Sequence, residues 1–355
     1  MTEYDFDRMI DEYLVYCHSR QLSKKTMASY EQSLRLFRRW CGDELKISTV
    51  GRVSESSIRN YIISIQERGK YSFYSGTEQK TLYKPERRRD YRKPVIPTTI
   101  NNYLRNLRAF FGWLAEENYI SRNPMKKVKF LKAPRKAKDY LTDDEFKKLV
   151  NSMDKSYFSE HRDYTMIMLM IDTGMRLGEC SMLKVSDINI TRRQISIRAD
   201  IAKGERERSV FFSQKTERVL RNWLQYKDRY VETEYLFPTK KSKMPVNVSG
   251  FETNFKGYVR RARIEKDVTP HCLRNNFAKR CLMNGMDIYT LSRLLGHSSV
   301  KVTEQAYLDL KLTRAEPISP VSALFQLLLP CSFVGQIFAQ ARQSSLRILS
   351  YCQGL

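Results

Sequence analysis

Residues 122–138 divide the chain into two parts that are expected to fold separately. They read RNPMKKVKFLKAPRKAK, with eight Lys or Arg residues and no acidic residue, and Pro124 and Pro134 disfavour a continuous helix through them. Helical patterns lie on both sides, and 355 residues are enough for about two cores of ordinary size. We therefore predict a mainly α protein of two domains, joined by a basic linker over residues 122–139.

The part before the linker, residues 1–121, shows helical spacing of its apolar residues in four places. Ser23 and Ser54 are suited to cap two of these helices, and Cys41-Gly42 is expected to end the second one. The predicted helices cover residues 5–18, 23–41, 54–67 and 98–117. Four helices within this length predict a small helical bundle.

The part after the linker, residues 140–312, is expected to combine helices with a small antiparallel β-sheet. Thr142 and Glu145 have the spacing of a capping box, and the apolar run over residues 163–174 predicts a buried helix that ends at Gly174. Alternating residues predict strands over 194–198 and 208–212. Further helices are predicted over residues 214–230, 249–263, 271–284, 287–295 and 300–308.

Basic residues outnumber acidic ones by a wide margin. Lys plus Arg number 63 and Asp plus Glu 39, so the net charge is +24. This surplus indicates a polyanionic partner such as nucleic acid; a basic enzyme without one is the alternative. The cations cluster in the linker and in a polar insert over residues 70–97, which is either a solvated loop or a basic arm along phosphates. The candidate DNA contacts are Arg87, Arg88, Arg89, Lys126, Lys127, Lys129, Lys132, Arg135, Lys136 and Lys138.

Seven cysteines are scattered along the chain without a C-x-x-C pair. Their odd number and wide spacing disfavour both a disulfide framework and a zinc knuckle. The pattern fits a reducing cytoplasm, and no metal site is expected.

Short polar motifs after the linker form an ordered set. His271 and Arg274 are three residues apart, so on a helix an imidazole and a guanidinium can reach one small anion. Each motif alone has an ordinary explanation, such as surface solvation, a helix cap or a buried ring. The complete order is improbable by chance, and it includes two of only four histidines. The set comprises Arg176, Lys203, His271, Arg274, His297 and Tyr307.

This ordered set resembles that of the tyrosine recombinase (phage integrase) family. The part before the linker, with LSKKTMASYEQSLRLFRRW, is similar to the family's core-binding domain, and the layout resembles Xer-type recombinases and mobile-element integrases. The resemblance covers roughly residues 5–312 and makes 140–312 the catalytic domain. It implies a site-specific recombinase that cuts and rejoins double-stranded DNA without metal, ATP or another cofactor. The intermediates would be a 3′-phosphotyrosyl bond and a four-way junction.

The resemblance also implies a role for each residue of the set. Tyr307 would attack the scissile phosphate, and its phenol needs activation because the ordinary pKa is near 10. Arg176 and Arg274 would hold the nonbridging oxygens with their planar donor forks. His271 and His297 would add hydrogen bonds, and one of them, with His271 favoured, would accept the tyrosine proton.

Two further residues complete the implied site. Lys203, at the expected hairpin turn, would protonate the departing 5′-oxygen as general acid. Arg206 and Arg208 are the local alternatives for that role. Glu179 would brace its neighbourhood through Arg176 or through the helix.

The family recombines two duplexes within a tetramer, which requires contacts between neighbouring subunits. Residues 313–355 form an apolar tail, in which the stretch from 317 onward has only Arg342 and Arg347 as charged residues. We favour docking of this tail on a neighbouring protomer. The alternatives are a fold back onto its own catalytic domain, a membrane segment and an altered reading frame. Its prolines and glutamines make a poor membrane span, so no membrane partner is expected.

Two other functions stay open at this stage, namely a type IB topoisomerase-like activity and a DNA-binding regulator without catalysis. The recombinase hypothesis itself leaves several tasks open: integration, excision or transposition of a mobile element, and resolution of chromosome dimers. The insert over residues 70–97 favours a mobile element. A homo-tetramer on DNA, with an accessory factor as a further candidate partner, in the cytoplasm at the nucleoid, is the expected setting.

Overall fold

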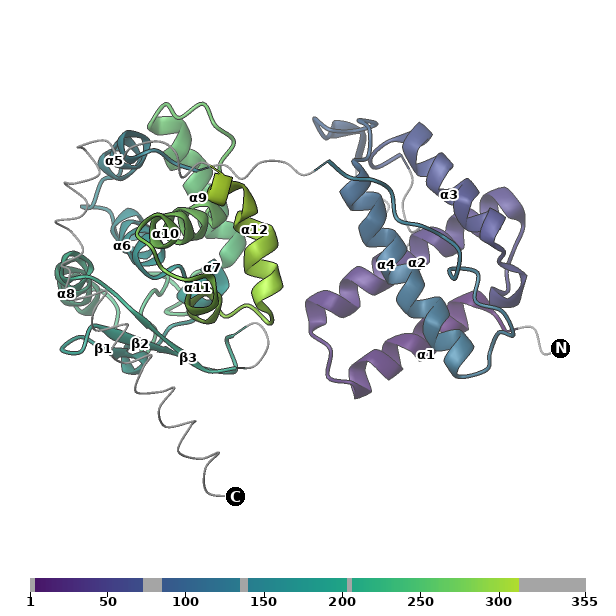
Figure 1. The fold of residues 1–355 in the computed structure, drawn as a ribbon, viewed down its shortest axis with the longest axis horizontal. Coiled ribbons are helices and arrows are strands. Elements are labelled where there is room, and N and C mark those ends of the chain that lie inside the picture. The colour runs from purple at the N-terminus through teal and green to yellow at the C-terminus, as the bar shows by residue number, and fades with distance from the viewer. Residues whose placement is uncertain (1–3, 73–84, 135–139, 203–205, 313–355) are drawn as a thin grey trace, which may run out of the picture. The chain divides into compact units, whose positions relative to one another are not determined.

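A computed structural model of the chain describes residues 4–72, 85–134, 140–202 and 206–312. The chain forms two compact units, Met1–Lys136 and Ala137–Leu355 (Figure 1). Helices dominate both units, and a small antiparallel sheet lies in the second, as predicted. Among the described residues no helix is both long enough and apolar enough to span a bilayer.

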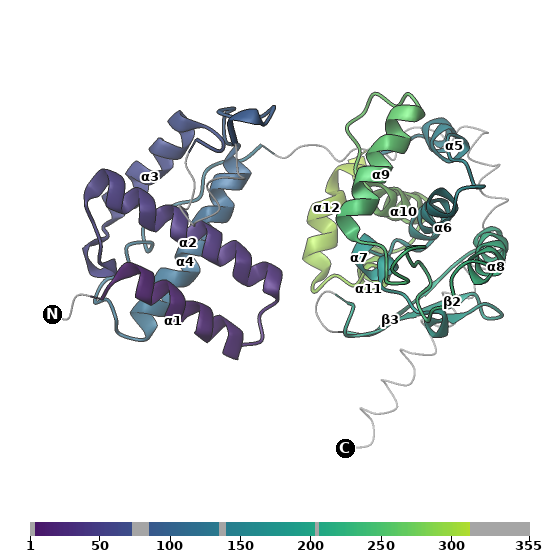
Figure 2. The same cartoon turned by 180° about the vertical axis from the view of Figure 1, so that it is seen from behind.

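The first unit is a bundle in which α2 packs against each of the other helices (Figure 2). Its core is aromatic, with Phe6, Phe37, Phe110 and Phe111 all inaccessible to solvent. Ser54 caps the third helix by accepting a hydrogen bond from the Ser57 N–H. The helices are α1 (Phe6–Ser19), α2 (Lys24–Leu45), α3 (Glu55–Arg68) and α4 (Pro97–Glu116), with 3₁₀ turns at Val50–Arg52 and Pro85–Arg87.

Helix α2 continues through Gly42 to Leu45, so the end expected at Cys41-Gly42 is wrong. A glycine inside a helix costs about 1 kcal/mol relative to alanine. Here Cys41 is fully buried and Leu45 packs on the core, and this packing outweighs the cost. The helix ends where Lys46 adopts a left-handed conformation with φ of 54°.

The first half of the predicted linker is packed onto the first unit. Met125 and Val128 are buried, and the Asn101 carboxamide brackets Leu131, accepting from its N–H at 2.8 Å and donating to its C=O at 2.9 Å. Arg108 donates to the Val128 carbonyl at 2.6 Å. The segment that connects the units is therefore shorter than the predicted 122–139.

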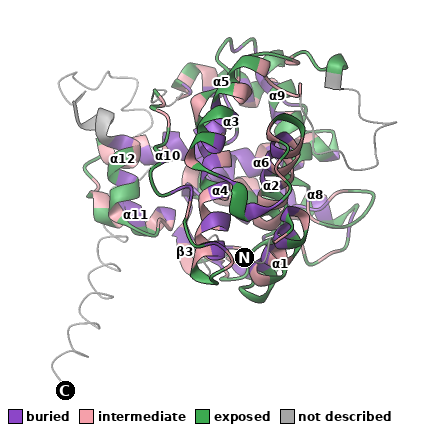
Figure 3. Cartoon of the chain, turned by 90° about the vertical axis from the view of Figure 1, so that its right-hand side faces the viewer, coloured by how far each residue is buried: buried purple, intermediate pink, exposed green. Residues whose placement is uncertain are grey.

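The second unit surrounds the buried helix α6 (Phe158–Thr173), which packs against α8 and α10. Thr142 and Glu145 form the predicted capping box, and Gly174 ends α6 in a left-handed conformation with φ of 67°. Residues 165–171 of α6 are all buried, which leaves no side of that part of the helix exposed; Figure 3 shows buried residues in purple. The other helices are α5 (Asp143–Asn151), α7 (Leu177–Ser181), α8 (Gln214–Asp228), α9 (Val248–Arg261), α10 (His271–Met283), α11 (Ile288–Leu295) and α12 (Val300–Leu312).

The sheet has the order β1-β2-β3 and is antiparallel throughout. The predicted strands are present as β2 (Gln194–Ile197) and β3 (Arg208–Phe211), whereas the short β1 (Ile188–Asn189) was not expected. Ile197 pairs with Arg208 at the end of the β2–β3 ladder. Strand β3 also contacts α6 and α11, so the sheet edge lies beside the polar motifs.

Candidate active site

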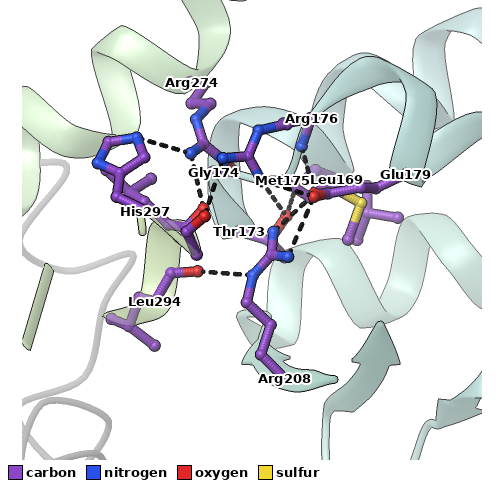
Figure 4. Close-up of polar contacts among 12 residues, drawn as sticks. Leu169, Thr173, Gly174, Met175, Arg176, Glu179, Arg208, Arg274, Leu294 and His297 are labelled. Atoms are coloured by element: carbon purple, nitrogen blue, oxygen red, sulfur yellow. Dashed lines mark hydrogen bonds and ion pairs between the residues drawn. The ribbon is translucent and has the colours of Figure 1, made fainter. Parts of the chain in front are cut away.

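Three arginines from different elements converge on the C-terminal end of α11 (Figure 4). Arg208 Nε donates to the Leu294 carbonyl at 3.1 Å, Arg274 Nη2 to the Leu295 carbonyl at 2.7 Å, and Arg176 Nη2 to the Gly296 carbonyl at 2.9 Å. The last carbonyls of a helix lack partners within it and carry partial negative charge. Successive carbonyls of one helix end therefore fix the spacing of the three guanidinium groups.

Glu179 lies between two of these arginines and is 1% exposed. Its carboxylate accepts Arg208 Nη1 at 3.0 Å and Nη2 at 2.6 Å, and it also accepts Arg176 Nη1 at 2.8 Å. Burial alone would raise the pKa of Glu179, but the hydrogen bonds and charge of Arg208, together with the hydrogen bonds of Arg176, hold it below its ordinary value. Glu179 therefore contacts Arg176 at two points, the guanidinium and the backbone N–H.

Arg274 is 2% exposed, and one of its nitrogens also reaches the ring of His297. Nη1 donates to the Gly174 carbonyl at 2.7 Å, and Nη2 lies 3.0 Å from His297 Nε2. Because arginine only donates, His297 Nε2 is the acceptor, and His297 Nδ1 donates to Thr303 Oγ1 at 2.6 Å. Burial, together with the positive charge of Arg176, lowers the pKa of Arg274.

The position of His297 follows from the glycine before it. Gly296 ends α11 in a left-handed conformation with φ of 62°, and the His297 N–H donates to the Ser292 carbonyl at 3.1 Å. This helix termination turns the chain so that the imidazole faces Arg274. The motif Gly296-His297 thus is a helix cap that also places a site residue.

Tyr307 lies next to this cluster, and its side chain is 3% exposed. The ring packs with Leu291 and Leu295 of α11, and the hydroxyl donates to Asn275 Oδ1 at 3.4 Å. Burial raises the pKa of Tyr307 to about 12, although the positive charge of Arg274 opposes the shift. The backbone of Tyr307, with φ of −129° and ψ of 16°, interrupts the helical geometry of α12.

Of the remaining predicted site residues, the structure describes some and leaves others outside the described segments. His271 is the first residue of α10 and is exposed, one turn before the buried Arg274. Lys203, Arg135, Lys136, Lys138 and the tail from 313 to 355 lie outside the described residues. The structure thus brings together Arg176, Glu179, Arg274 and His297, with Tyr307 beside them.

Seven of the ten predicted DNA contacts lie in described segments, and all seven are exposed. The base of the polar insert is closed by backbone bonds, with the Lys70 N–H donating to the Lys93 carbonyl and the Arg92 N–H to the Lys70 carbonyl, each at 2.9 Å. The Arg88 guanidinium lies 4.2 Å from the centre of the Tyr71 ring. The seven are Arg87, Arg88, Arg89, Lys126, Lys127, Lys129 and Lys132.

Arg208 has a place in the cluster that the sequence did not predict. From the sequence, Arg208 was an alternative to Lys203 as the general acid. In the structure its nitrogens donate to Glu179 and to the Leu294 carbonyl, and its side chain is 11% exposed. These partners lie 29 and 86 residues away along the chain, and no local pattern reveals such pairs.

Comparisons with known proteins identify the class of this fold. A structure of the Tn1549 transposon integrase (residues 82–397) in complex with a circular intermediate DNA superposes with a TM-score of 0.66 at 16% identity, covering 91% of this chain and 98% of that one. A lambda integrase dimer bound to a COC′ core site gives a TM-score of 0.63 at 17% identity, covering 84% and 97%. The fold is therefore that of integrase-type DNA recombinases.

Sequence comparisons identify the family. Residues 139–314 match the phage integrase family, and residues 10–77 match the phage integrase N-terminal SAM-like domain. A tyrosine recombinase of Thermosipho africanus is 26% identical over 298 residues, which are 84% of this chain and 93% of that protein. Tyrosine recombinase XerD of Listeria innocua is 25% identical over 303 residues, covering 83% and 92%. The chain belongs to the phage integrase family and is a tyrosine recombinase.

Proposed function

We propose that the chain is a site-specific recombinase that cuts and rejoins double-stranded DNA through a 3′-phosphotyrosyl intermediate and a four-way junction. The observation that carries this proposal is the cluster at the end of α11, where Arg176, Arg208 and Arg274 bond successive backbone carbonyls and the first two also contact the carboxylate of Glu179. Three guanidinium groups against one carboxylate leave a net charge of about +2 in a site that is largely buried.

A phosphodiester fits this charge. The positive charge of Arg176 is close enough to lower the pKa of Arg274, so the two cations repel each other. An anion between them relieves this repulsion, and the gain is largest for the transition state, in which negative charge on the nonbridging oxygens is greatest. Removing one such donor typically slows a reaction by roughly 10²–10³-fold.

The proposed reaction is a phosphoryl transfer to Tyr307. A bond forms between the tyrosine oxygen and phosphorus while the bond from phosphorus to the 5′-oxygen breaks. His271 or His297 takes the phenol proton, with His271 favoured because His297 Nε2 already accepts from Arg274. Lys203 gives a proton to the departing 5′-oxygen. Because the Tyr307 ring is buried against α11, part of α12 must move before the hydroxyl reaches a phosphate.

The proposed DNA contacts outside the arginine cluster are cations of the insert and of the predicted linker. We place the DNA backbone along the exposed cations of the insert and of the segment over residues 126–132, and we count Arg135, Lys136 and Lys138 as further DNA contacts. The working assembly is a homo-tetramer on two duplexes, with room for an accessory factor, in the cytoplasm at the nucleoid. Integration, excision or transposition of a mobile element is the favoured task, and chromosome dimer resolution is the alternative.

A plasmid with two copies of the DNA that flanks this gene tests the proposal. Purified protein is expected to yield joint products, either deletion circles or inversions, and the Tyr307→Phe variant none. Relaxation of supercoils without joint products would instead favour a topoisomerase-like enzyme. Salt-sensitive binding with neither outcome would favour a regulator.

A further inference from the structure

We propose that Arg208 is a positioning residue for Arg176, acting through the carboxylate of Glu179. This inference rests on the proposed function, in which Arg176 holds a nonbridging oxygen of the scissile phosphate. Arg208 itself reaches no DNA in this account, because its three nitrogens point to Glu179 and to the Leu294 carbonyl.

Contacts of its backbone and of its guanidinium hold Arg208 in place. It is the first residue of β3, paired with Ile197 in the last pair of the ladder, so its backbone is held by the sheet. Its guanidinium meets both oxygens of Glu179, the planar two-point contact that arginine makes and lysine cannot. The third contact, to Leu294, ties the same group to the end of α11.

Glu179, held by Arg208, in turn restrains the position of Arg176. Its Oε1 accepts both Arg208 Nη1 and Arg176 Nη1, and its Oε2 accepts both Arg208 Nη2 and the Arg176 backbone N–H. Without Arg208, the carboxylate keeps one cationic partner and can rotate toward it. Arg176 then loses a fixed partner on one side, while its bond to the Gly296 carbonyl holds only the other nitrogen.

Arg198 offers a matched control on the same hairpin. It also forms an ion pair with a carboxylate, Asp187, at 2.8 Å. Arg198 directly follows Ile197, the residue that pairs with Arg208 across the hairpin. Its ion-pair partners, Asp187 and Asp200, lie outside the arginine cluster. Loss of Arg198 therefore removes a comparable pair without touching Glu179.

The test compares Arg208→Ala, Arg176→Ala and Arg198→Ala in cleavage of nicked suicide duplexes. One duplex has an ordinary scissile phosphate, and the other has a methylphosphonate, in which an uncharged methyl replaces one nonbridging oxygen. On the ordinary phosphate we expect Arg208→Ala to be slower than the unchanged protein by on the order of 10²-fold. The methylphosphonate has less negative charge for Arg176 to stabilise. The ratio of the rate of the unchanged protein to that of the variant should therefore shrink on this duplex for Arg208→Ala, as it should for Arg176→Ala.

The same series contains the results that would overturn the inference. An Arg208→Ala ratio that is equal on both duplexes, or a loss as large in the Arg198→Ala variant, would reduce Arg208 to a structural role. So would full additivity in a variant that carries both Arg208→Ala and Arg176→Ala, because a residue that acts through Arg176 has little further effect once Arg176 is gone. If Arg208→Ala does not fold, Arg208→Lys keeps the cation but not the two-point contact, and it should show the same pattern with a smaller loss.

Failure of the proposed function gives a different result. If the unchanged protein forms no covalent adduct on the ordinary duplex, the recombinase proposal fails before Arg208 is examined. If the adduct forms and only the methylphosphonate comparison fails, the recombinase proposal stands and the role of Arg208 is wrong.

Discussion

Substitution of Gly296 by alanine should slow DNA cleavage beyond what its loss of folding stability explains. Gly296 has φ of 62°, and a Cβ added there would lie 3.0 Å from Cζ, Nε and Nη1 of Arg208. The guanidinium would have to move by a few tenths of an ångström, which disturbs its bonds to Glu179 and Leu294. Since a misplacement of 1 Å can cost roughly 10²-fold in rate, we expect a loss on the order of tenfold.

Gly285 provides the control for backbone strain. Its φ is 85°, also left-handed, and an added Cβ there meets nothing within 4 Å. A left-handed conformation costs an alanine about 1–2 kcal/mol, so both variants should lose similar stability in denaturant titrations. Only Gly296→Ala should slow adduct formation on suicide duplexes. Equal cleavage by the two variants would refute the claim that Arg208 must keep its position beside α11.

Three further results are expected from the same structure. Gly174→Ala should destabilise the second unit by roughly 2–5 kcal/mol in urea titrations, because the added carbon combines left-handed strain with a clash against Phe277, whereas Gly178→Ala has open space and should not destabilise; equal midpoints would contradict this. Burial lowers the pKa of His161 below its ordinary 6.5, so the unfolded chain binds the proton first and stability should fall as the pH drops below about 6.5. His161→Phe should flatten this decline, and an unchanged pH dependence would show that another group causes it. DNA affinity should fall steeply with salt, and replacing exposed cations by glutamine should reduce the slope by about 0.9 per lost phosphate contact in anisotropy titrations; an unchanged slope would remove them from the DNA contacts. The cations to replace are Lys126, Lys127, Lys129 and Lys132.

Local chemistry explains why much of the fold could be predicted. The pair Thr142 and Glu145 and the residues after Ser54 carry capping signals within one turn, and the structure contains both caps. Gly42 misled the prediction because its effect on helix stability is small and is decided by distant packing. The linker contained a usable signal, since Met125, Val128 and Leu131 recur every three residues among lysines and all face the first unit.

The candidate site also contains features that the sequence indicates and features that it does not. The ordered set named Arg176, Arg274, His297 and Tyr307, and the structure places these four side chains near the end of α11. The sequence could not reveal what holds them there, because that depends on backbone carbonyls at a helix end and on Arg208, whose partners are far away along the chain. Side chains that bind backbone groups leave no residue-specific pattern to find.

Covalent trapping on nicked suicide duplexes tests the central claim most directly. The duplexes are tiled across the DNA that flanks this gene, and the cut fragment diffuses away, so religation stops. The account predicts an SDS-stable protein–DNA adduct that peptide mapping places on Tyr307, with no adduct from Tyr307→Phe although that variant binds the same DNA. An adduct on another residue, or one that persists in Tyr307→Phe, would contradict the account.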